Sequence, residues 1–269
     1  MPLSEPGLDR AVVSPVIAAL QLPAFRPGQP RSMAWYEDFL ISNALIFAEA
    51  GITAIKVQDE TREVGAASFE TVARMSALCR TLRAAVPQLR LGIIVQAHDA
   101  IAPLAIADAC GAAFVRLKVF VGAAVNSDGM RPALNIPATQ YRAAIGRPDL
   151  KIYADVHDRT AVPLAPIPND MAALWAQQAG ADALVITGSG FDDTLARIVS
   201  ARAAGVVRPV LIGGGITTAN VGQALGAADG VVVSTALLRD GAAPDAFDLW
   251  DRDKTLRFAD AARRAVPYL

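Results

Sequence analysis

Short apolar runs rich in branched residues recur along the chain, and most are followed by a stretch with helical spacing of its apolar positions. The runs predict strands at Val13–Leu20, Ala54–Gln58, Leu91–Gln96, Phe114–Val119, Ile152–His157, Ala183–Thr187, Val210–Ile212 and Gly230–Ser234. They show little apolar–polar alternation, which is typical of parallel strands covered by helices on their outer face. The clearest helices are expected at Trp35–Glu49, Phe69–Ala85, Ile101–Cys110, Met171–Gln178, Thr194–Ala203, Ala219–Leu225 and Thr255–Ala265.

Glycines mark the start of several strand–helix repeats. Gly51, Gly111, Gly180 and Gly205 each follow a helical stretch and precede a strand. A glycine there supplies the left-handed conformation that ends a helix. Alternating strands and helices predict an α/β fold with a parallel sheet, and eight repeats favour a closed (β/α)₈ TIM barrel over an open doubly wound sheet. No composition shift or Ser/Gly linker divides the chain, so we expect a single barrel domain over residues 1–269.

Composition narrows the class of protein. The chain is 53% hydrophobic and 19% charged, which excludes a largely disordered protein. Its formal net charge is −1 and no basic stripe stands out, so no nucleic-acid partner is expected. No secretory signal or transmembrane segment is expected, and the default location is the cytoplasm. Cys79 and Cys110 lack metal-ligand spacing and are expected to be reduced, buried thiols. The sequence leaves open a homo-oligomer and peripheral contact with a membrane.

Two long connections are expected to leave the C-terminal ends of strands, where TIM barrels build their active sites. They are Phe25–Arg31 after the first strand and Val121–Pro137 after the fourth. Within the second, Asn126–Gly129 has the residues of a tight turn, and Asp128 is a candidate contact of a lid.

The last two repeats carry the features of a phosphate site. The glycines Gly213, Gly214 and Gly215 follow the seventh strand, and Ser234 and Thr235 follow the eighth. Glycine lets backbone N–H groups approach an anion, and a helix start adds unpaired donors. The alternative is that the glycines only form a tight turn. We favour phosphate binding by these five residues.

Polar side chains occupy alternate positions on three predicted strands. They are Lys56 and Gln58 on the second strand, Arg116 and Lys118 on the fourth, and Tyr153, Asp155 and His157 on the fifth. If these faces point inward, cations and a carboxylate meet near the top of the barrel. One interpretation is an internal salt bridge from Asp155 to Arg116 or Lys118. The functional interpretation makes Asp155 a proton-transfer group, tuned by the neighbouring cations.

The two histidines also follow strands. His98, His157 and Asp155 could hold a metal ion, but no metal motif matches their spacing, so no cofactor is predicted and a divalent metal is weakly supported. His98 and the aspartate after it could instead cap a helix. Asp59 belongs either to a solvated turn or to an acid/base pair. Gln58, Asp59 and His98 are kept as candidate ligand-binding residues.

Several segments, taken in order, resemble the BtpA family, also called the BtpA/SgcQ family. They are Leu20–Pro23, Ala109–Arg116, Phe120–Ala123, Ala154–Val156, Val185–Gly188, Val210–Gly215, Ala228–Val231 and Asp240–Gly241. The resemblance implies a barrel of the ribulose-phosphate-binding type. The family label refers to photosystem I biogenesis, and relatives look like phosphosugar enzymes. Positions that match the family include Arg116, Asp155 and Thr187 as well as the three glycines, and Thr187 and Gly188 join the candidate ligand-binding residues.

The chain departs from the family pattern at predicted strand ends. The family usually has His at Gln21, Glu-Asn near Gln58, Asn near His98, Asn at Lys118, and a Lys-His pair near Arg159 and the residue after it. Because chemistry in this fold occurs at strand ends, these departures allow a changed substrate or reaction.

Three functions remain open at this stage. The first is an isomerase or lyase acting on a small phosphorylated molecule, a phosphosugar or phosphoribosyl compound. Its catalytic candidates are Asp155, Lys118, Arg116 and His157. The second is a noncatalytic assembly or regulatory factor that keeps the phosphate pocket. The third is a metal-dependent hydrolase.

Overall fold

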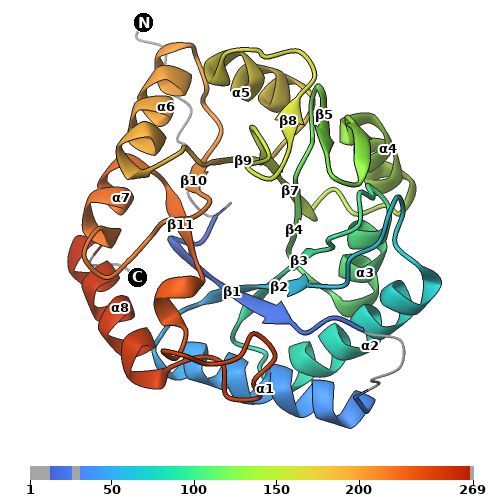
Figure 1. The fold of residues 1–269 in the computed structure, drawn as a ribbon, viewed down its shortest axis with the longest axis vertical. Helices are drawn as coiled ribbons and strands as arrows, with labels where there is room; N and C mark the ends of the chain where they lie inside the picture. The colour runs from blue at the N-terminus through green and yellow to red at the C-terminus, as the bar shows by residue number, and fades with distance from the viewer. Residues whose placement is uncertain (1–12, 26–30, 267–269) are drawn as a thin grey trace, which may run out of the picture.

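The computed structural model describes residues 13–25 and 31–266. Within them, parallel strands close into an eight-stranded barrel in the order β1-β11-β10-β9-β7-β4-β3-β2, which confirms the predicted fold class. Figure 1 looks down the barrel. The barrel strands are β1 (Val16–Leu22), β2 (Ala54–Asp59), β3 (Arg90–Ile94), β4 (Phe114–Leu117), β7 (Lys151–Asp155), β9 (Ala183–Ile186), β10 (Val210–Ile212) and β11 (Gly230–Val233).

Helices surround this ring of strands (Figure 1). They are α1 (Met33–Glu49), α2 (Phe69–Ala85), α3 (Ala102–Cys110), α4 (Asn135–Ala144), α5 (Asn169–Gln178), α6 (Phe191–Ala203), α7 (Val221–Ala227), α8 (Arg252–Ala265) and the 3₁₀ helix η2 (Thr235–Leu237). Side-chain caps explain why two helices begin earlier than predicted. The Ser32 side chain accepts from the Trp35 amide at the start of α1, and Asp251 accepts from Lys254 at the start of α8.

The glycines predicted to end helices have the expected conformation. Gly51, Gly111, Gly180 and Gly205 all have positive φ, between 71° and 103°. Each stands between a helix and the next strand, as the left-handed cap requires. Cys79 and Cys110 are free and buried, as expected.

The connection predicted over Val121–Pro137 is more ordered than expected. It contains the antiparallel hairpin of β5 (Ala123–Asn126) and β6 (Gly129–Pro132) and the start of α4, and β8 (Val162–Pro163) adds to β5. The expected turn lies between β5 and β6. In the connection predicted over Phe25–Arg31, residues 26–30 lie outside the described residues, as do residues 1–12, on which the expectation of no secretory signal partly rests.

Apolar side chains pack on both faces of the barrel strands. The larger cluster fills the space between strands and helices, and a smaller one lies inside the lower half of the barrel. Inside, the rings of Phe114 and Tyr153 stack with centroids 4.5 Å apart. A Cβ on Gly92 would lie 2.1 Å from the Phe114 ring, so the glycine makes room for it. The floor of the barrel is therefore packed solid. No helix in the described part of the chain is both long and apolar enough to span a bilayer.

Candidate functional site

A cavity of about 430 Å³ lies inside the upper half of the barrel, above the aromatic floor. At the C-terminal end of most barrel strands, the last side chain that points into the barrel is polar. Some of these residues belong to the strand and others come just after it. These side chains are Gln21, Gln58, Gln96, Lys118, His157, Thr187 and Ser234. One step lower, Lys56, Arg116 and Asp155 also line the cavity. The faces predicted to point inward therefore do so, because strand side chains alternate with period two.

Arg116 and Asp155 form a two-pronged ion pair. Arg116 Nε lies 2.8 Å from Asp155 Oδ1, and Arg116 Nη2 lies 3.1 Å from Asp155 Oδ2. Asp155 is only 6% exposed. Burial raises the pKa of the Asp155 carboxyl, and the adjacent Arg116 guanidinium opposes that rise. The internal salt bridge anticipated from the sequence thus exists, and it stands in the wall of an open cavity.

Two lysines are joined through amides to a single carboxylate. Lys56 Nζ donates to Gln58 Oε1, and Gln58 Nε2 donates to Glu60 Oε1 at 2.7 Å. Lys118 Nζ donates to Gln96 Oε1, and Gln96 Nε2 donates to Glu60 Oε2 at 3.2 Å. Burial lowers the pKa of both lysines, and that of Lys56 falls well below its ordinary value. Such lysines can donate a hydrogen bond or a proton to a substrate oxygen more readily than exposed ones.

The three glycines of the turn after β10 have different roles. The Gly213 amide donates to the Ile186 carbonyl at 3.0 Å, so it belongs to the barrel ladder. A Cβ at Gly213 would lie 2.3 Å from Thr187 Oγ1, so a side chain there would clash with Thr187. The amides of Gly214 and Gly215 donate to no other residue in the described part of the chain. Gly215 has φ +74°, which only glycine adopts at little cost.

Charged and hydroxyl groups complete the surroundings of this turn. A Cβ on Gly214 would lie 3.6 Å from Arg159 Nη1, which places the guanidinium against the turn. Ser234 Oγ donates to Gln21 Oε1 at 3.0 Å, and Thr235 opens η2 beside it. The last two repeats therefore bring glycine amides and hydroxyls to one cavity, and Arg159, from the segment after β7, adds a cation.

Three candidate ligand-binding residues lie outside this cavity. His98 Nε2 is 2.8 Å from the Pro132 carbonyl, and the amide of Gly188 donates to Thr194 Oγ1 at 2.8 Å. Asp59 is fully buried, and its Oδ1 accepts from the backbone two residues later. The structure thus gives each of them an intramolecular contact.

Asp128, the candidate lid contact, lies in the turn between β5 and β6. Its carboxylate accepts from Arg62 at 2.5 Å and from Arg131 at 3.1 Å. Arg62 belongs to the segment after β2, so this ion pair links the hairpin to that segment.

The histidines and Asp155 do not converge on a metal site. His98 and His157 line different cavities, and in residues 13–25 and 31–266 no three His, Cys, Asp or Glu side chains are grouped as metal ligands. The hydrolase hypothesis therefore has no ligand set to rest on in this part of the chain.

Five polar residues that the sequence did not single out as site residues also line the cavity: Gln21, Gln96, Asp158, Arg159 and Thr160. Gln96 could have been found, because it follows Ile94 on the same face of the third strand. Asp158 and Arg159 lie in an irregular segment, where no periodicity indicates direction.

Known proteins that are similar to this chain agree with the resemblance seen in its sequence. A family model described as the BtpA family matches residues 12–264. An uncharacterized protein from Archaeoglobus fulgidus is 29% identical over 246 residues, which cover 88% of this chain and 94% of that one. The photosystem I biogenesis protein BtpA of Synechocystis sp. is 33% identical over 162 residues, 59% of this chain and 56% of that protein.

Solved structures share the barrel. A native KDPGal structure covers 95% of both chains with a TM-score of 0.58 and 17% identity. The phosphoribosyl anthranilate isomerase of Thermus thermophilus aligns with a TM-score of 0.54 and 14% identity, over 93% of this chain and 99% of that one. At these identities the likeness concerns the fold.

Proposed function

This chain belongs to the BtpA family, and from that premise we propose that it is an enzyme that binds a small phosphorylated metabolite at the mouth of its barrel. The substrate class is a phosphosugar or a phosphoribosyl compound. One observation carries the proposal: the glycine turn after β10 and the hydroxyls after β11 line the same cavity as Asp155, Arg116 and Lys118.

The phosphate would lie at the last two repeats. Gly214 and Gly215 offer amides that are not used elsewhere in the described structure, and Arg159 lies beside them. Phosphate oxygens need several N–H donors and positive charge at close range. Four cations and two carboxylates line the cavity, so a dianionic phosphate meets a surplus of positive side chains.

The reacting carbon atoms would lie deeper, next to the ion pair. Asp155 would move a proton, since burial raises the pKa of its carboxyl toward the range useful for acid–base work. Lys118 and Arg116 would stabilise the negative charge that develops on a substrate oxygen. His157 lines the same cavity, and burial lowers the pKa of its imidazole, which keeps it neutral and able to accept a proton.

This arrangement suits an isomerase or a lyase. Both reactions need a proton moved at carbon or oxygen while an adjacent oxyanion is held. The Thermus neighbour is named as an isomerase of a phosphoribosyl compound, which agrees with this reaction class.

Calorimetric titration with inorganic phosphate and ribose 5-phosphate tests the binding site. Gly214→Asp places a carboxylate in the amide cradle and is expected to weaken both ligands at least about tenfold, because like charges repel. Gly226→Asp is the matched control, since Gly226 has open space around it and lies at the opposite end of the barrel. Unchanged affinity in Gly214→Asp, or binding by neither ligand in the parent protein, would refute the proposal.

A noncatalytic factor gives a different pattern. It would bind the phosphorylated ligands with the same sensitivity to Gly214→Asp, but it would turn over no member of a phosphosugar panel. The Synechocystis relative is named as a biogenesis protein, which favours this second candidate.

A further inference from the structure

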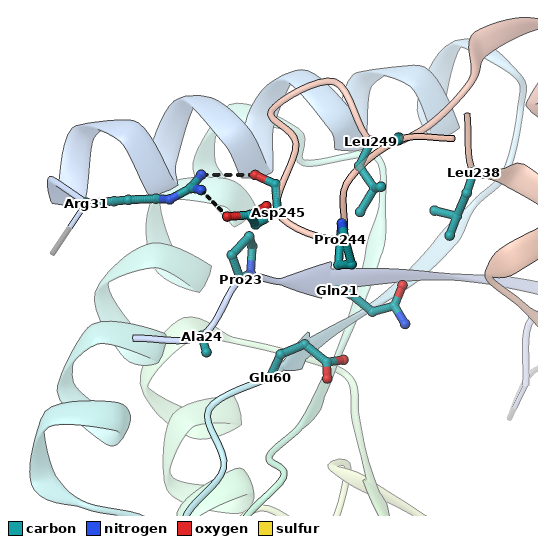
Figure 2. A pocket seen from close by; sticks show the side chains of 10 residues that line it. Gln21, Pro23, Ala24, Arg31, Glu60, Leu238, Pro244, Asp245 and Leu249 are labelled. Atoms are coloured by element: carbon teal, nitrogen blue, oxygen red, sulfur yellow. Dashed lines mark hydrogen bonds and ion pairs between the residues drawn. The ribbon is translucent and has the colours of Figure 1, made fainter. Parts of the chain in front are cut away.

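A second cavity, of about 750 Å³, adjoins the phosphorylated-metabolite site. Gln21 lines both cavities, and its hydrogen bond with Ser234 stands at their boundary. Figure 2 shows the second cavity between the end of β1 and the segment that follows η2. Ser234 and Leu238 lie four residues apart on one stretch of chain, one on each side of the boundary.

The wall of this second cavity is mostly apolar. Leu238, Ala242, Pro244 and Leu249 line it from the segment after η2, and Pro23 lines it from the end of β1. Mostly apolar walls with a few placed polar groups are typical of sites for organic ligands. A sugar or phosphate alone would leave this apolar surface uncovered.

The charges of the cavity leave one carboxylate without a cation. Arg31 Nη2 lies 2.6 Å from Asp245 Oδ2, and Arg31 Nη1 donates to the Asp245 carbonyl at 3.0 Å, so these two neutralise each other (Figure 2). Glu60 accepts from the amides of Gln58 and Gln96, and no cation pairs with it in the described residues. The second cavity is therefore net acidic, whereas the first is net basic.

We propose that the second cavity holds the end of the substrate that carries no phosphate, and that this end is a neutral or cationic ring system with N–H or O–H donors. The apolar wall would pack on the ring, and Glu60 would accept from its donors. A second phosphate is excluded there, because it would be desolvated against a carboxylate. This inference rests on the proposed function and specifies its substrate as a ring-bearing monophosphate.

Titration with three classes of probe tests the inference. Ribose 5-phosphate supplies the phosphate end alone, the four common ribonucleoside 5′-monophosphates add a ring, and fructose 1,6-bisphosphate adds a second phosphate. We expect at least one nucleoside monophosphate to bind at least about tenfold more tightly than ribose 5-phosphate, and the bisphosphate to bind no more tightly.

Two variants test whether the tighter binding of a ring-bearing ligand arises in the second cavity. Ala242→Phe fills the second cavity and is expected to abolish the advantage of the ring while leaving the affinity for ribose 5-phosphate unchanged. Ala243→Phe is the matched control, since Ala243 is exposed on the same segment and does not line the cavity. Circular dichroism and thermal unfolding establish that both variants fold.

The outcomes separate this inference from the proposed function. If ribose 5-phosphate binds but no ring adds affinity, or if the bisphosphate binds tenfold more tightly, the second cavity does not have the assigned role. The same conclusion holds if Ala242→Phe and Ala243→Phe behave alike. If no phosphorylated probe binds, the proposed function itself fails.

Discussion

At the scale of single residues, Asp155 is under two opposing influences. Its burial raises the pKa of the carboxyl, and its two contacts with Arg116 oppose that rise. The buried ion pair of Asp155 with Arg116 contributes little net stability, because the cost of removing both charges from water offsets their attraction. Its position in a cavity wall is better explained by chemistry than by stability.

Replacing Asp155 with Asn removes the transferable proton and keeps the shape of the side chain. We expect turnover of a phosphosugar to fall by about 10²- to 10⁴-fold, while affinity for ribose 5-phosphate stays within about threefold. Product formation and calorimetry measure the two quantities. Asp149→Asn is the control, because Asp149 precedes the same strand and its side chain pairs with Arg147 at the surface. Full turnover in Asp155→Asn would remove Asp155 from the reaction.

Asp59 is a buried carboxyl that is expected to affect the pH dependence of stability, whereas Asp155 is expected to affect turnover. Burial raises its pKa from 3.8 to about 6, and its Oδ2 has no partner among the described residues. A carboxyl whose pKa is higher in the folded state favours folding while it is protonated, and this contribution is lost as pH rises from about 4 to above 6.

Asp59→Asn should abolish that dependence. The free energy of unfolding of the parent protein, taken relative to Asp59→Asn, is expected to fall by about 2 kcal/mol between pH 4.5 and 7.5. Urea unfolding of both proteins at the two pH values gives the difference. A difference that stays constant or grows with pH would show that Asp59 is not buried as the structure has it.

Residues on regular strands were the predictable part of the site. Alternation placed Lys56, Arg116, Lys118 and Asp155 on inward faces, and each lines the cavity. Arg159 could not be foreseen in this way, because it belongs to an irregular segment and meets Gly214 only when the barrel closes.

At the scale of elements, packing inside the barrel depends on one glycine of β3. The Phe114 ring occupies the space that a Cβ of Gly92 would need, and it stacks on Tyr153. These side chains form the floor on which the polar layer of the cavity rests.

Gly92→Ala is therefore expected to destabilise the protein by about 1–3 kcal/mol through overpacking. Phe114→Leu removes the clashing ring, so the double variant should be less destabilised than the sum of the two single variants. A double-mutant cycle from urea unfolding measures the coupling. Additive effects would mean that the ring and the glycine do not meet.

Local signals in the sequence located most elements, and long-range pairing supplied the rest. The glycine caps, the strands and most helices were predicted within a few residues. The β5–β6 hairpin was not, because only its turn has a local signature and β5 also pairs with β8, some forty residues along the chain.

At the scale of the whole molecule, barrel closure decides which repeats meet. β1 pairs with β11, so Gln21 near the N-terminal end of the chain lies against Ser234 near its C-terminal end. We propose that residues 1–269 form a single domain, since α8 packs on both α1 and α7. Barrel closure also brings a basic cavity next to an acidic one. A bound substrate would therefore place its phosphate in the basic cavity and its other end in the acidic cavity.

The most direct test of the central claim is a crystal structure of the protein with ribose 5-phosphate. We expect phosphate oxygens about 3 Å from the amide nitrogens of Gly214 and Gly215 and within reach of Arg159. Phosphate bound elsewhere, or a glycine turn whose amides point away from the bound anion, would contradict it.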